Sequence, residues 1–120
     1  MFTIKFRHVT LSVKDLDESI KFYREVVGLE ITERFPAGPG MEIVFLADGD
    51  TAVELISGGA EASAGAVILG FESASLEDTM ALLKEKGYQF KEKVISPDPK
   101  TRFFFAKDPD GYNVQFFNPK

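Results

Sequence analysis

The feature of this sequence that most restricts its fold is an internal repeat. An alternating polar and apolar run, an amphipathic stretch and a glycine followed by a hydrophobic residue occur in both halves of the chain. Three pairs of matching positions are separated by 60 (68 − 8), 60 (76 − 16) and 59 (87 − 28) residues. A near-constant offset over three kinds of element indicates a duplicated supersecondary unit. We therefore expect one domain, 1–120, made of modules 1–59 and 64–120 and a small, polar linker at 58–65.

The first copy has the pattern of a strand, a helix and three further strands. Polar and apolar residues alternate along 4–13, as in a strand with one buried face. Asp15 or Asp17 can cap the helix that follows, and Gly28 is expected to end it in a left-handed conformation. The three further strands are expected at Leu29–Phe35, Met41–Ala47 and Thr51–Ser57.

The second copy repeats this order. A strand is expected at Ala66–Ser73 and a helix at Ser75–Lys86, with Gly87 at its end. Further strands are expected at Tyr88–Val94, Thr101–Ala106 and Tyr112–Asn118, with the turn residues Asp108–Gly111 between the last two. The fold class is thus α+β: two tandem βαβββ modules that form a curled, eight-stranded mixed sheet. One helix per module covers only one sheet face, so the helix-free faces are expected to line a cup that serves as the ligand site.

Composition excludes several classes of partner. The net charge is −5 and the basic residues are scattered, which is not the pattern of a nucleic-acid-binding protein. No run approaches the roughly 20 apolar residues of a membrane span, and residues 1–8 have no apolar signal core. The chain has no cysteine, so disulfides and thiolate chemistry are excluded. These features favour a cytoplasmic protein.

Two segments resemble a known superfamily. The run from His8 to Tyr23, followed by Gly28 and Leu29, is similar to the opening of a vicinal oxygen chelate protein, and the run from Asp108 to Phe116 is similar to its close. This superfamily includes glyoxalase I, extradiol dioxygenases, fosfomycin-resistance transferases and bleomycin-binding proteins. The resemblance covers nearly the whole chain and implies the glyoxalase/bleomycin-resistance fold and a homodimer. It does not select one chemistry, because the scaffold supports many reactions.

The resemblance also implies four metal-ligand positions. His8 and Glu54 match the first-module imidazole and carboxylate of the glyoxalase I pattern. Ile68 stands where a second histidine is expected, and Gln115 stands where a glutamate is expected. Ser12 replaces an arginine that meets the glutathione carboxylate in glyoxalase I, which argues against that substrate.

Strand alternation independently places His8 and Glu54 on the face away from the helix. With Gln115 they can form a three-ligand site for one divalent metal, Zn²⁺, Ni²⁺, Fe²⁺ or Mn²⁺. Alternatively, His8 and Glu54 pair with each other, or Glu54 pairs with Arg34 or Arg102, because a buried carboxylate needs a partner. His8, the only histidine, and Glu54 are the candidate catalytic residues.

Two functional hypotheses follow. The favoured one is a protein that binds a small, aromatic or apolar molecule in the cup without a firmly bound metal, with Arg102, Phe104 and Phe117 as substrate-binding residues. The alternative is a metal-dependent lyase, isomerase or dioxygenase that uses His8, Glu54 and Gln115. Whether the chain is an enzyme is left open by the sequence.

Overall fold

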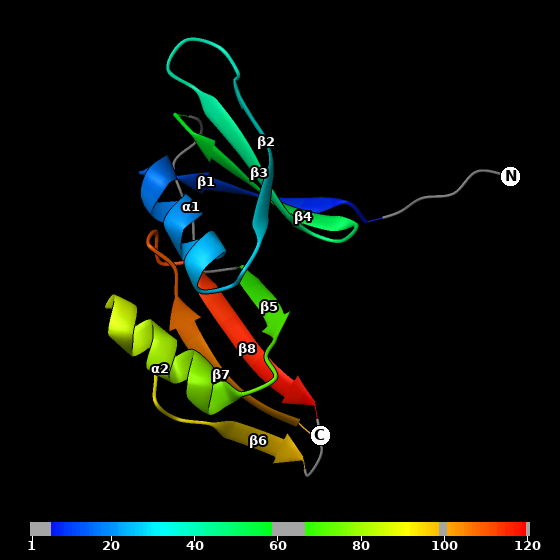
Figure 1. The fold of residues 1–120 in the computed structure, drawn as a ribbon, viewed down its shortest axis with the longest axis vertical. Helices are drawn as coiled ribbons and strands as arrows, with labels where there is room; N and C mark the ends of the chain where they lie inside the picture. The colour runs from blue at the N-terminus through cyan, green and yellow to red at the C-terminus, as the bar shows by residue number, and fades with distance from the viewer. Residues whose placement is uncertain (1–5, 59–66, 99–100, 120) are drawn as a thin grey trace, which may run out of the picture. The chain divides into compact units, whose positions relative to one another are not determined.

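The chain folds into two compact units, Met1–Ala62 and Ser63–Lys120, and each is described by itself. The computed structural model describes residues 6–58, 67–98 and 101–119 (Figure 1). Apart from Gly58, the predicted linker 58–65 lies outside these residues. Unit 1 contains β1 (His8–Val13), α1 (Leu16–Glu25), β2 (Glu30–Pro36), β3 (Glu42–Asp48) and β4 (Thr51–Ser57). Unit 2 contains β5 (Ile68–Glu72), α2 (Leu76–Lys86), β6 (Ile95–Asp98), β7 (Thr101–Lys107) and β8 (Asn113–Pro119).

Each unit forms its own four-stranded mixed sheet. The strand orders are β1-β4-β3-β2 and β5-β8-β7-β6. The first and last strands of each unit pair in parallel, whereas the remaining neighbours are antiparallel. The sequence order explains this pattern, because the antiparallel strands follow one another and the parallel pair is separated by the helix and two strands. The expected α+β class of two βαβββ modules is confirmed, with the eight strands divided between two sheets.

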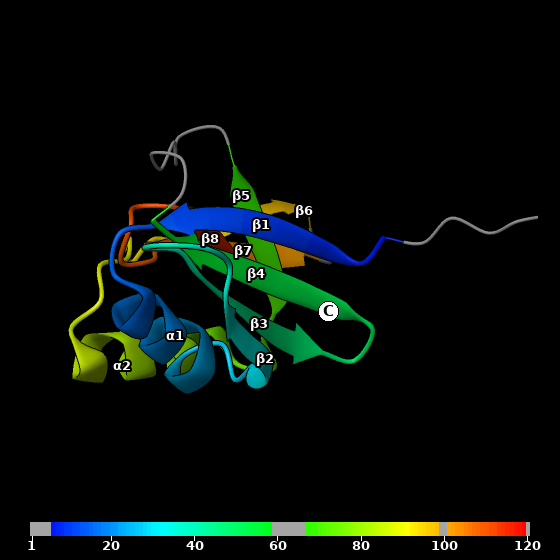
Figure 2. The ribbon, with the colours of Figure 1, turned by 90° about the horizontal axis from the view of Figure 1, so that it is seen from above.

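One helix covers one face of each sheet. Figure 2 shows α1 against one side of the sheet of unit 1. The helix buries Leu16, Ile20, Phe22 and Tyr23, and the sheet buries Leu11, Val44, Leu46 and Leu55 toward it. Full burial of one such side chain contributes about 1.5–3 kcal/mol to folding. We call this side of each sheet the covered face and the opposite side the open face.

The helix ends match the capping expectations in part. Asp15, not Asp17, is the N-cap of α1, where its Oδ1 accepts the Glu18 N–H at 3.2 Å. Gly87 ends α2 in the left-handed conformation, as expected. Gly28 does not end α1, which stops at Glu25. Its φ of +88° instead turns the loop toward β2, which suits glycine because it has no Cβ.

The strand predicted at Tyr88–Val94 is wrong. The strand in this part of unit 2 is β6, Ile95–Asp98, and the preceding segment makes one isolated bridge, between Phe90 and Ala106. Phe90 is held by an edge-to-face contact with Phe104 at 6.0 Å. The Lys-Glu-Lys run after Phe90 offers no further apolar residue to pack on the sheet, so regular pairing is interrupted there.

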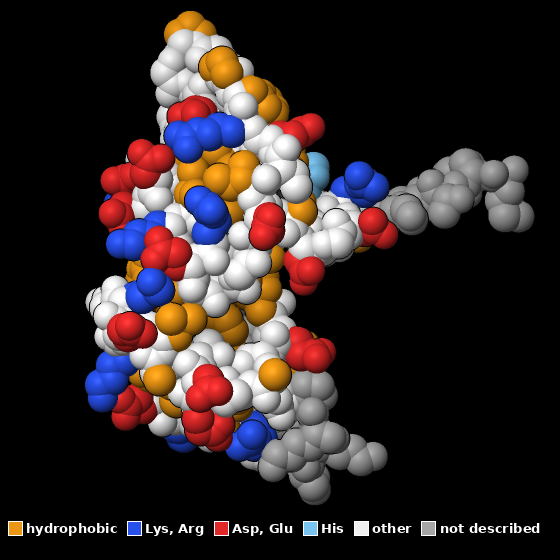
Figure 3. Space-filling view, viewed as in Figure 1, with side chains coloured by type: hydrophobic (Ala, Val, Ile, Leu, Met, Phe, Trp, Pro, Cys, Tyr) orange, Lys and Arg blue, Asp and Glu red, His pale blue; other side chains and the backbone are white. Residues whose placement is uncertain are grey.

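The surface carries both signs of charge. On the face that Figure 3 shows, Lys and Arg side chains are interspersed with Asp and Glu. Among the described residues, no helix has the length and apolar character that crossing a membrane requires.

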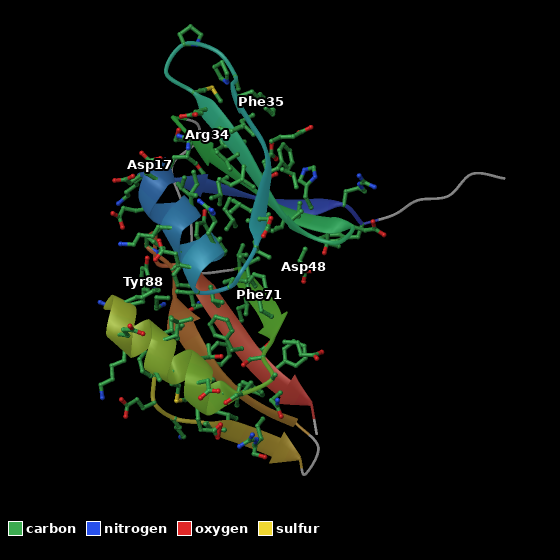
Figure 4. The ribbon with its side chains drawn as sticks, viewed as in Figure 1. Asp17, Arg34, Phe35, Asp48, Phe71 and Tyr88 are labelled. Atoms are coloured by element: carbon green, nitrogen blue, oxygen red, sulfur yellow. The ribbon has the colours of Figure 1, made fainter. Side chains whose placement is uncertain are left out.

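The turn before β8 is organised by a buried carboxylate. Asp108 is 4% exposed, and its Oδ1 accepts the backbone N–H groups of Asp110 and Tyr112, each at 2.9 Å. The equivalent turn of unit 1 carries Asp48, which is exposed (Figure 4). The two turns therefore differ in how much they depend on the aspartate.

We expect Asp108→Ala to lower the free energy of unfolding by about 1–3 kcal/mol, because the buried N–H of Tyr112 and the partly buried N–H of Asp110 lose their acceptor. Asp48→Ala is the matched control and should change stability little, since its side chain is exposed. Urea unfolding followed by circular dichroism measures both effects. Equal losses in the two variants would contradict the role given to Asp108.

Candidate functional site

The structure brings His8 and Glu54 together on the open face of unit 1. The Nε2 atom of His8 lies 3.4 Å from Oε1 of Glu54, and the hydroxyl of Thr10 donates a hydrogen bond to the same oxygen. The side chain of His8 is 40% exposed and that of Glu54 is 13% exposed. We call these three residues the polar cluster. It joins one imidazole, one carboxylate and one hydroxyl at a single point of the sheet.

Strand register explains why these side chains meet. Thr10 of β1 lies directly beside Glu54 of β4 in the parallel pair, and His8 is two residues earlier on the same face. Val53 and Leu55, on either side of Glu54, are buried toward α1. Glu54 is therefore held on the open face, in an inner strand, where its partly buried carboxylate accepts a hydrogen bond from Thr10 and lies beside His8.

An aromatic row adjoins the polar cluster. Phe45 of β3 is paired with Glu54, and its ring meets the His8 imidazole edge to face at a centroid distance of 5.3 Å. Phe35 of β2, which is 40% exposed, stacks on Phe45 at 6.4 Å. Sequence reasoning missed Thr10, Phe35 and Phe45 as site residues. The signal for Phe45 is the short turn between β3 and β4. Counting the antiparallel register from this turn places Phe45 opposite Glu54.

A cavity of about 360 Å³ opens beside the aromatic row. His8 and Phe45 form one part of its lining, and Arg7, Glu33 and Asp50 carry its charges. Its size lies within the range of small-molecule pockets. The open face of unit 1 thus combines a cavity, exposed aromatic rings and a hydrogen-bonding cluster.

Unit 2 does not repeat the polar cluster. Ile68, 57% exposed, takes the position of His8, and Gly70 takes that of Thr10. Gln115, paired with Gly70, takes the position of Glu54. A Cβ on Gly70 would lie 3.4 Å from Oε1 of Gln115, so the amide packs over the glycine where unit 1 has a hydroxyl donor. The equivalent point of unit 2 therefore has neither an imidazole nor a carboxylate.

The structure corrects the predicted placement of two substrate-binding residues. Phe104 is fully buried on the covered face and stacks on Phe116 at 5.5 Å. Arg102, two residues earlier, lies on the same face, where its Nη1 is 3.5 Å from Oε1 of Glu77. Phe117, by contrast, lies on the open face, since it neighbours the buried Phe116. Neither Arg102 nor Phe104 is retained as a contact to substrate.

Arg34 has other partners than Glu54. Its Nε donates to Oε2 of Glu42 at 2.6 Å, and its Nη2 lies 3.3 Å from Oδ1 of Asp17 (Figure 4). The hydrogen bond to Glu42 raises the pKa of Arg34 and lowers the pKa of Glu42. This group links β2, β3 and the first turn of α1. Of the partners considered for Glu54 from the sequence, the structure shows His8, and Thr10 is an additional partner.

The side chains present fit a firmly bound divalent metal poorly. Within the described part of the chain, no three His, Cys, Asp or Glu residues form a group that could hold a metal ion. The polar cluster supplies two strong donor groups, whereas catalytic zinc sites have three protein ligands. At the two matching positions of unit 2, Ile68 cannot ligate and Gln115 offers only a neutral amide oxygen.

Three curated relatives are similar over nearly the whole chain. The uncharacterized protein YwbC of Bacillus subtilis is 32% identical over 92% of this chain and 94% of its own length. A lactoylglutathione lyase of Haemophilus influenzae is 29% identical over 94% of this chain and 91% of its own length. A lactoylglutathione lyase of Schizosaccharomyces pombe is 29% identical over 96% of this chain, which spans only 47% of that protein.

Solved structures share the fold. The trypanothione-dependent glyoxalase I of Leishmania major has a TM-score of 0.81 at 23% identity, over 97% of this chain and 87% of that one. The antibiotic-binding protein TnmS3 of Streptomyces sp. CB03234 has a TM-score of 0.76 at 23% identity, over 100% of this chain and 99% of that one. The family profile matches residues 5–116, and the chain belongs to the Glyoxalase/Bleomycin resistance protein/Dioxygenase superfamily.

Proposed function

We propose that this protein binds a small molecule with an aromatic or apolar surface on the open face of unit 1, without a firmly bound metal. The observation that carries the proposal is the contact of the polar cluster with the aromatic row. His8 meets both Glu54, at 3.4 Å, and Phe45, at a centroid distance of 5.3 Å. An apolar ligand body can stack on the rings while its polar end reaches the carboxylate.

Glu54 is the group that orients the ligand in this proposal. Its Oε1 already accepts from Thr10 and lies beside His8, whereas Oε2 makes no hydrogen bond with a described residue. Oε2 can therefore accept a hydroxyl or N–H of the ligand. His8, at the more exposed side of the cluster, can form a hydrogen bond with the same ligand through its imidazole. A homodimer in the cytoplasm is the expected setting.

A second candidate function is a metal-dependent lyase, isomerase or dioxygenase, with His8, Glu54 and Gln115 as metal ligands. Two observations favour it. The 3.4 Å between Nε2 of His8 and Oε1 of Glu54 is compatible with two ligands on one ion, and two relatives are named lactoylglutathione lyase. When bound, such a metal would supply Lewis-acid activation of a substrate oxygen. Glu54 would then be the group that moves a proton.

Elemental analysis separates the two candidates. We expect a metal-to-chain ratio near zero in protein purified without chelator. The ratio should stay there after incubation with Ni²⁺, Zn²⁺, Fe²⁺ or Mn²⁺ and desalting, because two strong ligands hold a divalent ion weakly. Stoichiometric metal in the unmodified protein, lost in His8→Ala, would overturn the metal-free proposal.

The aromatic row can be tested with the neutral fluorescent probe N-phenyl-1-naphthylamine. Phe45→Ala should weaken its binding roughly two- to tenfold, because one aromatic contact is lost. Phe6→Ala removes a ring that is 72% exposed and does not belong to the row, so it should leave the affinity unchanged. A fluorescence titration measures both. If Phe45→Ala binds the probe as well as the unmodified protein does, the site on unit 1 is wrong.

A further inference from the structure

A second cavity, of about 350 Å³, lies on the open face of unit 2. Ile68 of β5 and Phe105 of β7 give it an apolar part, and Asn113 of β8 adds an amide. Gln89 and two lysines, Lys91 and Lys107, complete the polar part of its lining. Three of these positions match the cavity of unit 1 through the repeat, since Ile68, Phe105 and Lys107 each lie 60 residues after His8, Phe45 and Ala47 (68 − 8, 105 − 45, 107 − 47).

Backbone hydrogen bonds place Lys91 on this face. The N–H of Lys91 donates to the carbonyl of Phe105 at 3.0 Å, and the N–H of Lys107 donates to the carbonyl of Gln89 at 3.0 Å. These bonds flank the bridge between Phe90 and Ala106. Because Phe90 packs against the buried Phe104 on the covered face, its neighbours Gln89 and Lys91 project to the open face, beside Phe105 and Lys107.

Among the described residues that line this cavity, no carboxylate balances the positive charge. Nζ of Lys107 donates to Oδ1 of Asn113 at 2.9 Å, which is a neutral acceptor and leaves the ammonium charge in place. No acidic residue is among the described residues that line the cavity, and no described carboxylate pairs with Lys91. The cavity of unit 1 differs, since Glu33 and Asp50 accompany its single arginine.

The two lysines of this cavity are not part of a generally basic surface. The chain as a whole has a net charge of −5, yet this cavity has two cations and no described anion. Its apolar part is available to a ligand, because the Ile68 side chain is 57% exposed. The ring of Phe105 is held in place by an edge-to-face contact with Phe103 at 5.6 Å. Two cations at one side of an apolar surface match an anion attached to an apolar body.

We infer that the cavity of unit 2 binds an organic anion, an aromatic or apolar body that carries one carboxylate, sulfonate or phosphate group. The anionic group lies between Lys91 and Lys107, and the body packs on Ile68 and Phe105. The inference rests on the proposed function in taking the ligand to be a small molecule, and it names the chemical class of the ligand and the residues of unit 2 that bind it.

Two probes with the same aromatic body test it. 8-Anilinonaphthalene-1-sulfonate carries an anionic group, and N-phenyl-1-naphthylamine is the same body without it. The sulfonate should bind more tightly, and Lys91→Gln, Lys107→Gln should weaken it roughly tenfold while changing the neutral probe less than about twofold. Lys91→Arg, Lys107→Arg should keep most of the sulfonate affinity, because the charges remain.

The matched control is Lys84→Gln, Lys86→Gln, which removes the same net charge from the last turn of α2, outside the cavity. It should leave both affinities unchanged, and thermal unfolding checks that all variants are folded. Equal loss of sulfonate binding in the control and in the Lys91, Lys107 variant would overturn the inference and leave the proposed function intact. Sulfonate binding that depends on these lysines, together with neutral-probe binding that is indifferent to Phe45, would overturn the proposed function alone. Absence of binding by both probes would overturn both.

Discussion

In each unit the first strand pairs in parallel with the last, and the helix between them covers one side of the sheet. This pairing sets Thr10 beside Glu54 and fixes which side chains of the neighbouring strands share a face with them. A shift by one residue would turn Glu54 toward α1 and Val53 toward the open face. The close packing of Leu11, Val44 and Leu55 under the helix opposes that shift. The apolar packing on the covered face thus determines which polar side chains lie on the open face.

The two units have the same scaffold and different surfaces. Equivalent points carry Glu54 in one unit and Gln115 in the other, and the matching cavities differ in the charges that line them. Such divergence is tolerated on the open face, because its side chains are less completely buried than those of the covered face. The differences at neighbouring positions are related. Gly70, at the position of Thr10, has no side chain and so leaves room for the amide of Gln115.

The sequence predicts which face a side chain occupies where polar and apolar residues alternate clearly. Along β1 and β4, polar and apolar residues alternate, so the shared face of His8 and Glu54 could be predicted. The run Phe103–Phe105 consists of three phenylalanines without polar and apolar alternation. The sequence pattern therefore does not show that Phe104 is the residue that is fully buried. The sequence pattern does not identify Lys91 either, because it predicts a regular strand where the chain before β6 makes only one isolated bridge. Its position depends on two backbone hydrogen bonds to β7 that no local pattern indicates.

The hydrogen-bonded pairing described for each unit has a consequence for how the chain folds. The bond between Thr10 and Glu54 spans 44 residues, and that between Ser73 and Asn118 spans 45. Both separations are much longer than those within a helix or hairpin, but each is less than half of the chain. The entropic cost of closing each loop is therefore moderate. During synthesis, β1 to β4 can assemble while the second half is still being translated. Substitutions that slow pairing in unit 1 should therefore delay the earliest folding step and leave the later one unchanged.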